Sequence, residues 1–123
     1  MNKIEMYRVA DAIEKGIKDT TFNMNHVIYK EHPCGTQACI AGHVILMNNL
    51  TVDKNIDVVG EFLGLEYKQY NELFFAWSAT TRFSEINNNK KHVPAVIRWM
   101  ADNEEINWDK AIASIPEWRK EDE

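Results

Sequence analysis

The run from Ala38 to Met47 constrains the fold more than any other part of the chain, because it carries no formal charge and only one strongly polar side chain, His43. Wound as a helix, it shows apolar residues on every face, which is typical of a helix buried on all sides. Small residues such as Gly42 let neighbouring backbones approach closely. We predict a buried central helix over 36–48, with Thr36 as its N-cap.

Size and charge narrow the class of protein. A chain of 123 residues with 45% hydrophobic content predicts one domain, 1–123, that buries its own core. The net charge of −5 argues against nucleic acid, which needs a basic face. The longest apolar run is about ten residues, short of the ~20 that span a membrane. Charged residues from the start argue against a signal peptide, so we predict a cytoplasmic protein with reduced cysteines.

Helical periodicity elsewhere predicts a mainly α fold. Residues 3–18 place an apolar stripe opposite charged positions, and Gly64 suits the left-handed position that ends a helix. Residues 20–35 have no helical period and contain Pro33, so we expect one irregular or extended segment there. The further predicted helices are 53–63 (capped by Thr51 or Asp53), 66–77, one with Pro94 in its first turn, and 108–114 capped by Asn107.

The polar stretch 78–91 is predicted as a long connection, and such connections are often functional. Together these elements predict a compact bundle of about five or six helices packed around the helix at 36–48. Trp77, Arg82 and Phe83 flank the connection, and aromatic and arginine side chains are typical interface anchors. The alternative is that Trp77 closes the core and Arg82 is solvated.

Four potential metal ligands, His32, Cys34, Cys39 and His43, lie close together in the sequence. Cys39 and His43 are one helical turn apart, a spacing that metal pairs use. A closed zinc site needs four converging ligands, and its cysteines are commonly about two residues apart rather than four. We therefore predict no metal and no other cofactor, and these four residues are the candidates if a metal does bind.

The same region allows three other interpretations. Cys39 near a helix N-terminus could be a nucleophile with His43 as its base, because the helix dipole lowers a thiol pKa. Alternatively, both residues belong to the core, with His43 bonded to a backbone carbonyl, and this is the interpretation that we favour. The turn Cys34-Gly35-Thr36 could also hold an anionic ligand at the helix N-terminus.

The segment Cys34-Gly35-Thr36-x-x-Cys39-Ile40-Ala41-Gly42-His43 resembles the signature of an uncharacterised family of small phage and bacterial proteins. That family carries Phe-x-Met before the signature, and Leu-Gly-Leu, Leu-Phe and a hydrophobic-x-Trp after it. Many relatives have Trp at the position of His43, which speaks against an obligatory ligand or base there. The matching segments here are Phe22-Asn23-Met24, Leu63-Gly64-Leu65, Leu73-Phe74 and Ile106-Asn107-Trp108.

The resemblance implies an α-helical accessory protein of a phage or mobile element. By analogy with other small acidic accessory proteins, we predict a non-enzymatic protein that binds a host protein, with inhibition of a host enzyme or defence system as one outcome. The alternative is a small enzyme or ligand-binding protein that uses the region from Cys34 to His43 for a thiol, a metal or a nucleotide-like anion. The residues leave the oligomeric state open.

Overall fold

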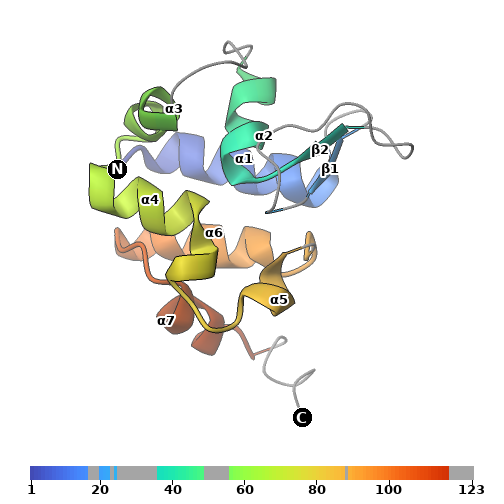
Figure 1. Ribbon diagram of the computed structural model, residues 1–123, viewed down its shortest axis with the longest axis vertical. Helices are drawn as coiled ribbons and strands as arrows, with labels where there is room; N and C mark the ends of the chain where they lie inside the picture. Colours follow the sequence, from blue (N-terminus) through green and yellow to red (C-terminus); the bar gives the residue numbers. More distant parts are fainter. Residues whose placement is uncertain (17–19, 23, 25–35, 49–55, 88, 117–123) are drawn as a thin grey trace.

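The protein folds as a mainly α structure, shown in Figure 1. This is a computed structural model, and it describes residues 1–16, 20–22, 24, 36–48, 56–87 and 89–116; the side chains of 20–22, 36–38 and Trp77 are outside the description. Within these residues no helix is long and apolar enough to cross a membrane. The helices are α1 (Lys3–Lys15), α2 (Ile40–Met47), α3 (Ile56–Phe62), α4 (Tyr67–Phe74), α5 (Phe83–Ile86), α6 (Val93–Asn103) and α7 (Trp108–Ala113).

Helix α1 follows its sequence pattern closely. The side chain of Asn2 caps its first turn by accepting a hydrogen bond from the backbone N–H of Glu5. The helix ends at Lys15, three residues earlier than predicted, because Gly16 adopts a positive φ of 82° that closes its last turn. Its apolar stripe is fully buried and consists of Met6, Val9, Ala10 and Ile13.

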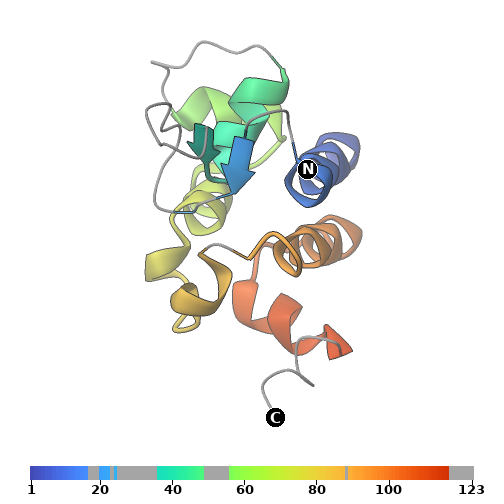
Figure 2. The same cartoon turned by 90° about the vertical axis from the view of Figure 1, so that its right-hand side faces the viewer.

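Helices α1 and α6 form an antiparallel pair, and Figure 2 shows them side by side with α7 beneath. The Arg98 guanidinium donates to Asp11 at 2.6 Å and to Glu14 at 3.2 Å, and these contacts raise the Arg98 pKa, the bond to Glu14 most of all. At the other end of the pair the Tyr7 hydroxyl donates to Asp102. These exposed contacts set the alignment of the two helices more than their stability.

Helix α2 is the central helix that the sequence predicts, although it begins later. Six consecutive residues, from Ile40 to Ile45, are buried, and the helix packs against α1, α3 and α4. Burial of every face explains why the run lacks charge. The structure corrects the helix start and its N-cap. Thr36 is not the N-cap, because Cys39 occupies that position without a side-chain capping bond.

Two short strands explain why Thr36 is not the N-cap of α2. The strand β1 (Thr20–Phe22) pairs in parallel with β2 (Thr36–Ala38), in the register Thr20 to Thr36. Backbone bonds along a strand pair replace the single side-chain bond, worth about 1 kcal/mol, that an N-cap at Thr36 would make. The prediction of an extended segment in 20–35 therefore holds at 20–22, where it has a strand partner; 25–35 lies outside the described residues.

Helices α3 and α4 pack against each other across a short link. Gly64 between them has a φ of 69°, as the sequence predicts for a left-handed helix end, and the backbone N–H of Asn2 donates to the Leu63 carbonyl at 2.7 Å. Helix α4 begins with a capping box between Glu66 and Gln69. The proposed caps of α3, Thr51 and Asp53, lie outside the described residues.

The second half differs from prediction in two places. Helix α4 stops at Phe74 and is followed by a separate 3-10 turn, η1 (Ala76–Ser78), instead of running to Trp77. The stretch 78–91 is not a continuous loop, because α5 forms within it and buries Ile86 completely. Pro94 lies in the first turn of α6 and the Asn107 side chain caps α7, both as predicted. Trp108 ties α7 to α4 by donating from Nε1 to the Glu72 carbonyl at 2.8 Å.

Candidate functional site

The cysteine and histidine of α2 are part of the core. Cys39 is 2% exposed and His43 is 1% exposed. Nδ1 of His43 lies 2.9 Å from the Cys39 carbonyl oxygen, and because a carbonyl can only accept, this nitrogen is the donor. The predicted structural role of both residues, with His43 bonded to a backbone carbonyl, is confirmed.

The environment of Cys39 is the opposite of what a nucleophile needs. Burial raises the pKa of its thiol, and nearby backbone N–H groups offset this only in part. The thiol therefore stays protonated at neutral pH, whereas a reactive cysteine has a lowered pKa and access to solvent. Nδ1 of the His43 ring is bonded to the Cys39 backbone carbonyl.

The metal and anion hypotheses both involve residues that lie outside the described part of the chain. His32, Cys34 and Gly35 lie outside them, so both hypotheses stay predictions there. In the part of the chain that the structure describes, no three His, Cys, Asp or Glu side chains converge on a point. Thr36 is in strand β2 and α2 begins at Ile40, so the helix N-terminus invoked for anion binding is displaced from the turn.

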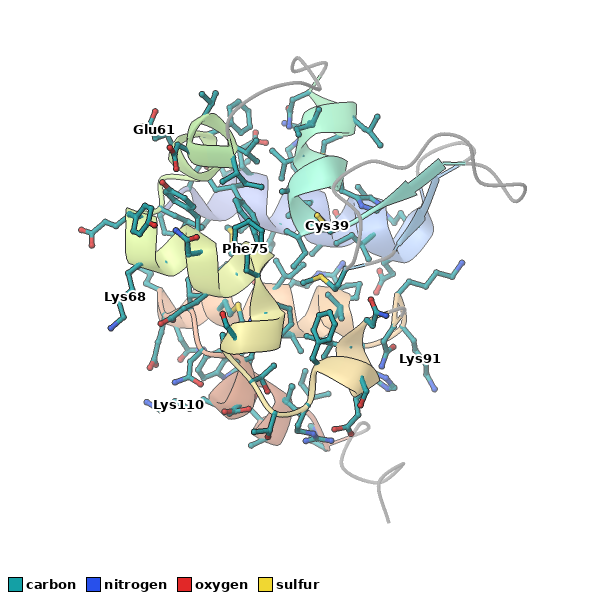
Figure 3. All side chains as sticks on the ribbon, viewed as in Figure 1. Cys39, Glu61, Lys68, Phe75, Lys91 and Lys110 are labelled. Carbon is teal, nitrogen blue, oxygen red and sulfur yellow. The ribbon has the colours of Figure 1, made fainter. Side chains whose placement is uncertain are left out.

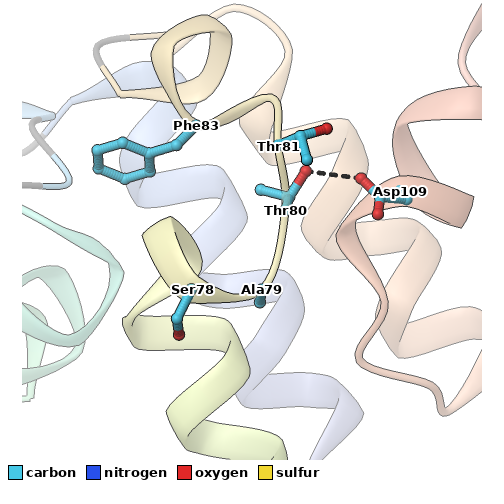
Figure 4. A pocket seen from close by; sticks show the side chains of 6 residues that line it. All are labelled: Ser78, Ala79, Thr80, Thr81, Phe83 and Asp109. Atoms are coloured by element: carbon cyan, nitrogen blue, oxygen red, sulfur yellow. Dashed lines mark hydrogen bonds between the residues drawn. The ribbon is translucent and has the colours of Figure 1, made fainter.

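A second candidate site lies beside the segment that follows η1. An open hollow of about 610 Å³ is present between this segment and the start of α7. Figure 4 shows the segment as an arch, with Ser78 at one end, Phe83 at the other and Thr80 turned toward α7. We call this region the 78–83 surface, and it consists of Ser78, Ala79, Thr80, Thr81, Phe83 and Asp109.

Thr80 holds the arch in place. Its side chain is almost fully buried, and its hydroxyl donates to the Asp109 carboxylate at 2.6 Å. The same hydroxyl oxygen accepts from the backbone N–H of Arg82 at 3.1 Å. One side chain thus fixes the turn locally and joins it to α7, so the rim of the hollow is set before anything binds.

The predicted interface anchors are only partly at this surface. Phe83 lines the hollow and packs its ring partly against the core. Arg82 makes a two-pronged pair with Glu85, at 2.6 Å and 2.5 Å, so its guanidinium is engaged within the protein. The side chain of Trp77 lies outside the description. Sequence reasoning missed Asp109, which reaches Thr80 from 29 residues away, a proximity that no local pattern indicates.

No family model matches the chain, and searches of curated proteins and of solved structures likewise return no match.

Proposed function

We propose that this protein acts by binding another protein, and that the 78–83 surface is the contact. The observation that supports this most is the open hollow whose rim is held by the bond from Thr80 to Asp109. A small-molecule site usually encloses most of its ligand. An open and ordered depression suits one side chain of a partner whose remaining surface lies on the surrounding rim.

The lining of the hollow favours a basic side chain of the partner. Ala79 and Phe83 offer apolar contact, while Ser78 and Thr81 are exposed and carry hydroxyls. Asp109 is the one charged residue among the described residues that line it. An arginine or lysine combines an apolar stem with a cationic tip, and both parts match this lining.

The nature of the partner comes from the family resemblance. We take the protein to be an accessory protein of a phage or mobile element, present in the host cytoplasm, and its partner to be a host protein. Inhibition of a host enzyme or defence system is one consequence of such binding. A net charge of −5 supports a partner with a basic contact surface and speaks against nucleic acid.

The alternative of a thiol or ligand site in 34–43 has less support. Of its described members, Cys39 and His43 are buried in the core, where Nδ1 of His43 bonds to the Cys39 carbonyl, and Thr36 is in strand β2. A hydrolytic triad has no support either, since the buried hydroxyl of Thr80 is bonded to a carboxylate and not to a histidine.

The test compares two variants that add the same charge at different exposed positions. Thr81→Arg fills and charges the hollow, whereas Ile4→Arg alters an exposed residue of α1. Affinity capture from host cells is quantified for the wild type and both variants, and the captured partner is then purified. We expect one partner to be kept by Ile4→Arg and to bind Thr81→Arg at least about tenfold more weakly. Equal retention by both variants, or no specific partner, contradicts the proposal.

A further inference from the structure

A second surface with a distinct chemistry lies on the α3–α4 pair. Tyr67, the first residue of α4, is 72% exposed. Its ring meets that of Tyr70 nearly at a right angle, with centroids 5.6 Å apart. This edge-to-face contact positions the exposed ring without covering it.

Tyr70 is the fixed support of this arrangement. It is 5% exposed, and its hydroxyl donates to the Asp57 carboxylate across the helix pair. Its ring packs so closely on α3 that a Cβ at Gly60 would lie 2.2 Å from it. Tyr70 is therefore held both by the packing of its ring on α3 and by the bond from its hydroxyl, and Tyr67 rests against it.

Helix α3 carries two carboxylates on the side that Tyr70 contacts. Glu61 is one helical turn after Asp57, so both lie on the same side of α3. The hydrogen bond to Asp57, then burial, raises the pKa of Tyr70 to about 12, and the charges of Asp57, Tyr67 and Glu61 add to this. The Tyr67 ring contacts the Tyr70 ring, and Glu61 is one helical turn from the Asp57 that Tyr70 binds, so both residues are placed beside the Tyr70–Asp57 pair. Figure 3 shows that Lys68 points away from α3, so it does not neutralise Glu61.

The α3–α4 pair carries mainly negative charge. From Ile56 to Phe74 the chain has four carboxylates (Asp57, Glu61, Glu66 and Glu72) and one basic residue, Lys68. Glu61 is exposed, and no described residue forms an ion pair with it. An exposed ring beside an exposed carboxylate is complementary to a cation that is planar and weakly hydrated.

We propose that Tyr67 and Glu61 form a contact for an arginine side chain that a partner protein presents. The guanidinium stacks on the exposed ring of Tyr67 and pairs with the Glu61 carboxylate. Tyr70 and Asp57 act as positioning residues, since they hold the ring and do not touch the ligand. This contact is separate from the 78–83 surface and does not depend on it.

The test is an NMR titration of the full-length protein with a defined probe. The probe is a capped pentapeptide with a single arginine between glycines, and the control peptide has neutral citrulline in its place. We expect the arginine peptide to shift backbone amides at 57–61 and 67–70, and the citrulline peptide to shift them much less. Tyr67→Ala is expected to weaken binding about two- to fivefold, as is Glu61→Gln.

Two further variants make the outcome specific. Tyr67→Phe keeps the ring and is expected to bind like the wild type, while Tyr7→Ala removes another half-exposed tyrosine with a carboxylate neighbour and is expected to change nothing at 57–70. Shifts that spread evenly over acidic residues, or that survive Tyr67→Ala, overturn the proposal. So do concentration-dependent shifts at 57–70 without peptide, because they indicate that a second copy covers this surface. None of these variants alters the 78–83 surface.

Discussion

Helix α2 and the 78–83 surface differ in how the character of their sequences relates to their places in the structure. The run from Cys39 to Met47 stands out because it lacks formal charge, contains small residues such as Gly42, and includes both Cys39 and His43. In the structure this run forms the buried helix α2 and the residue before it. The 78–83 segment consists largely of alanine, serine and threonine residues, followed by Arg82 and Phe83, yet it borders a hollow whose rim is held by the bond from Thr80 to Asp109. A distinctive sequence can therefore reflect the demands of packing on every face, while a hollow on the surface can come from common residues that the fold brings together.

The largest difference between the two regions should appear in stability. Ile45→Ala in α2 removes a fully buried side chain and is expected to lower the free energy of unfolding by about 2–5 kcal/mol. Its matched control, Val58→Ala, truncates an apolar side chain on the surface of α3 and should change stability by less than about 0.5 kcal/mol. Urea denaturation measures both. Similar small losses for the two variants would show that α2 is not the centre of the core.

The next effect tests the close packing of the α3–α4 pair. Gly60→Ala places a Cβ 2.2 Å from the Tyr70 ring and 2.8 Å from its Cβ, so the side chain as a whole must shift. The clash is expected to exceed the helix-propensity gain of about 1 kcal/mol and to destabilise the protein by about 1–3 kcal/mol. Thermal unfolding checks this prediction, and a variant more stable than the wild type would contradict the contact.

A smaller loss of stability is expected for a substitution in the 78–83 surface. Thr80→Val keeps the shape of the side chain but removes its bonds to Asp109 and to the backbone of Arg82. The expected cost is about 1–2 kcal/mol, because a backbone N–H loses its partner. The neighbouring exposed residue provides the control, with Thr81→Val expected to stay within about 0.5 kcal/mol. If the two variants unfold at the same urea concentration, Thr80 does not hold the rim.

The last prediction concerns the pH dependence of stability, to which Tyr70 should contribute in alkali. Its pKa in the folded protein is about 12, raised first by the bond to Asp57, so the folded state retains the proton more strongly than the unfolded chain does. Its contribution is complete below about pH 10 and is lost as the pH rises toward 12. Tyr70→Phe should flatten the fall in stability over that range. An unchanged pH profile would contradict the role assigned to the hydroxyl.

Local patterns predicted the features that depend on local physics. The apolar stripe of α1, the Asn107 cap and the left-handed Gly64 follow from helix geometry, and the buried His43 follows from the apolar residues around it. Each of these can be inferred from neighbours within about one or two helical turns.

Features that depend on distant partners could not be predicted in this way. Thr36 is in a strand because Thr20 pairs with it, and nothing within 36–38 indicates that partner. Helix α5 is only four residues long, too short to show a helical period. The contact from Thr80 to Asp109 joins two segments that only the packing of α7 brings together.

The most direct measurement of the contrast between core and surface is the rate of thiol alkylation in the native protein. Cys34→Ser leaves Cys39 as the single thiol, and adding Cys39→Ser and Thr81→Cys to that variant moves the thiol to the 78–83 surface. We predict that the thiol at 81 reacts nearly as fast as in the unfolded chain, while Cys39 reacts at least about a thousandfold more slowly and only through unfolding. Rapid alkylation of Cys39 at neutral pH would contradict its place in the core and return α2 to consideration as the functional site.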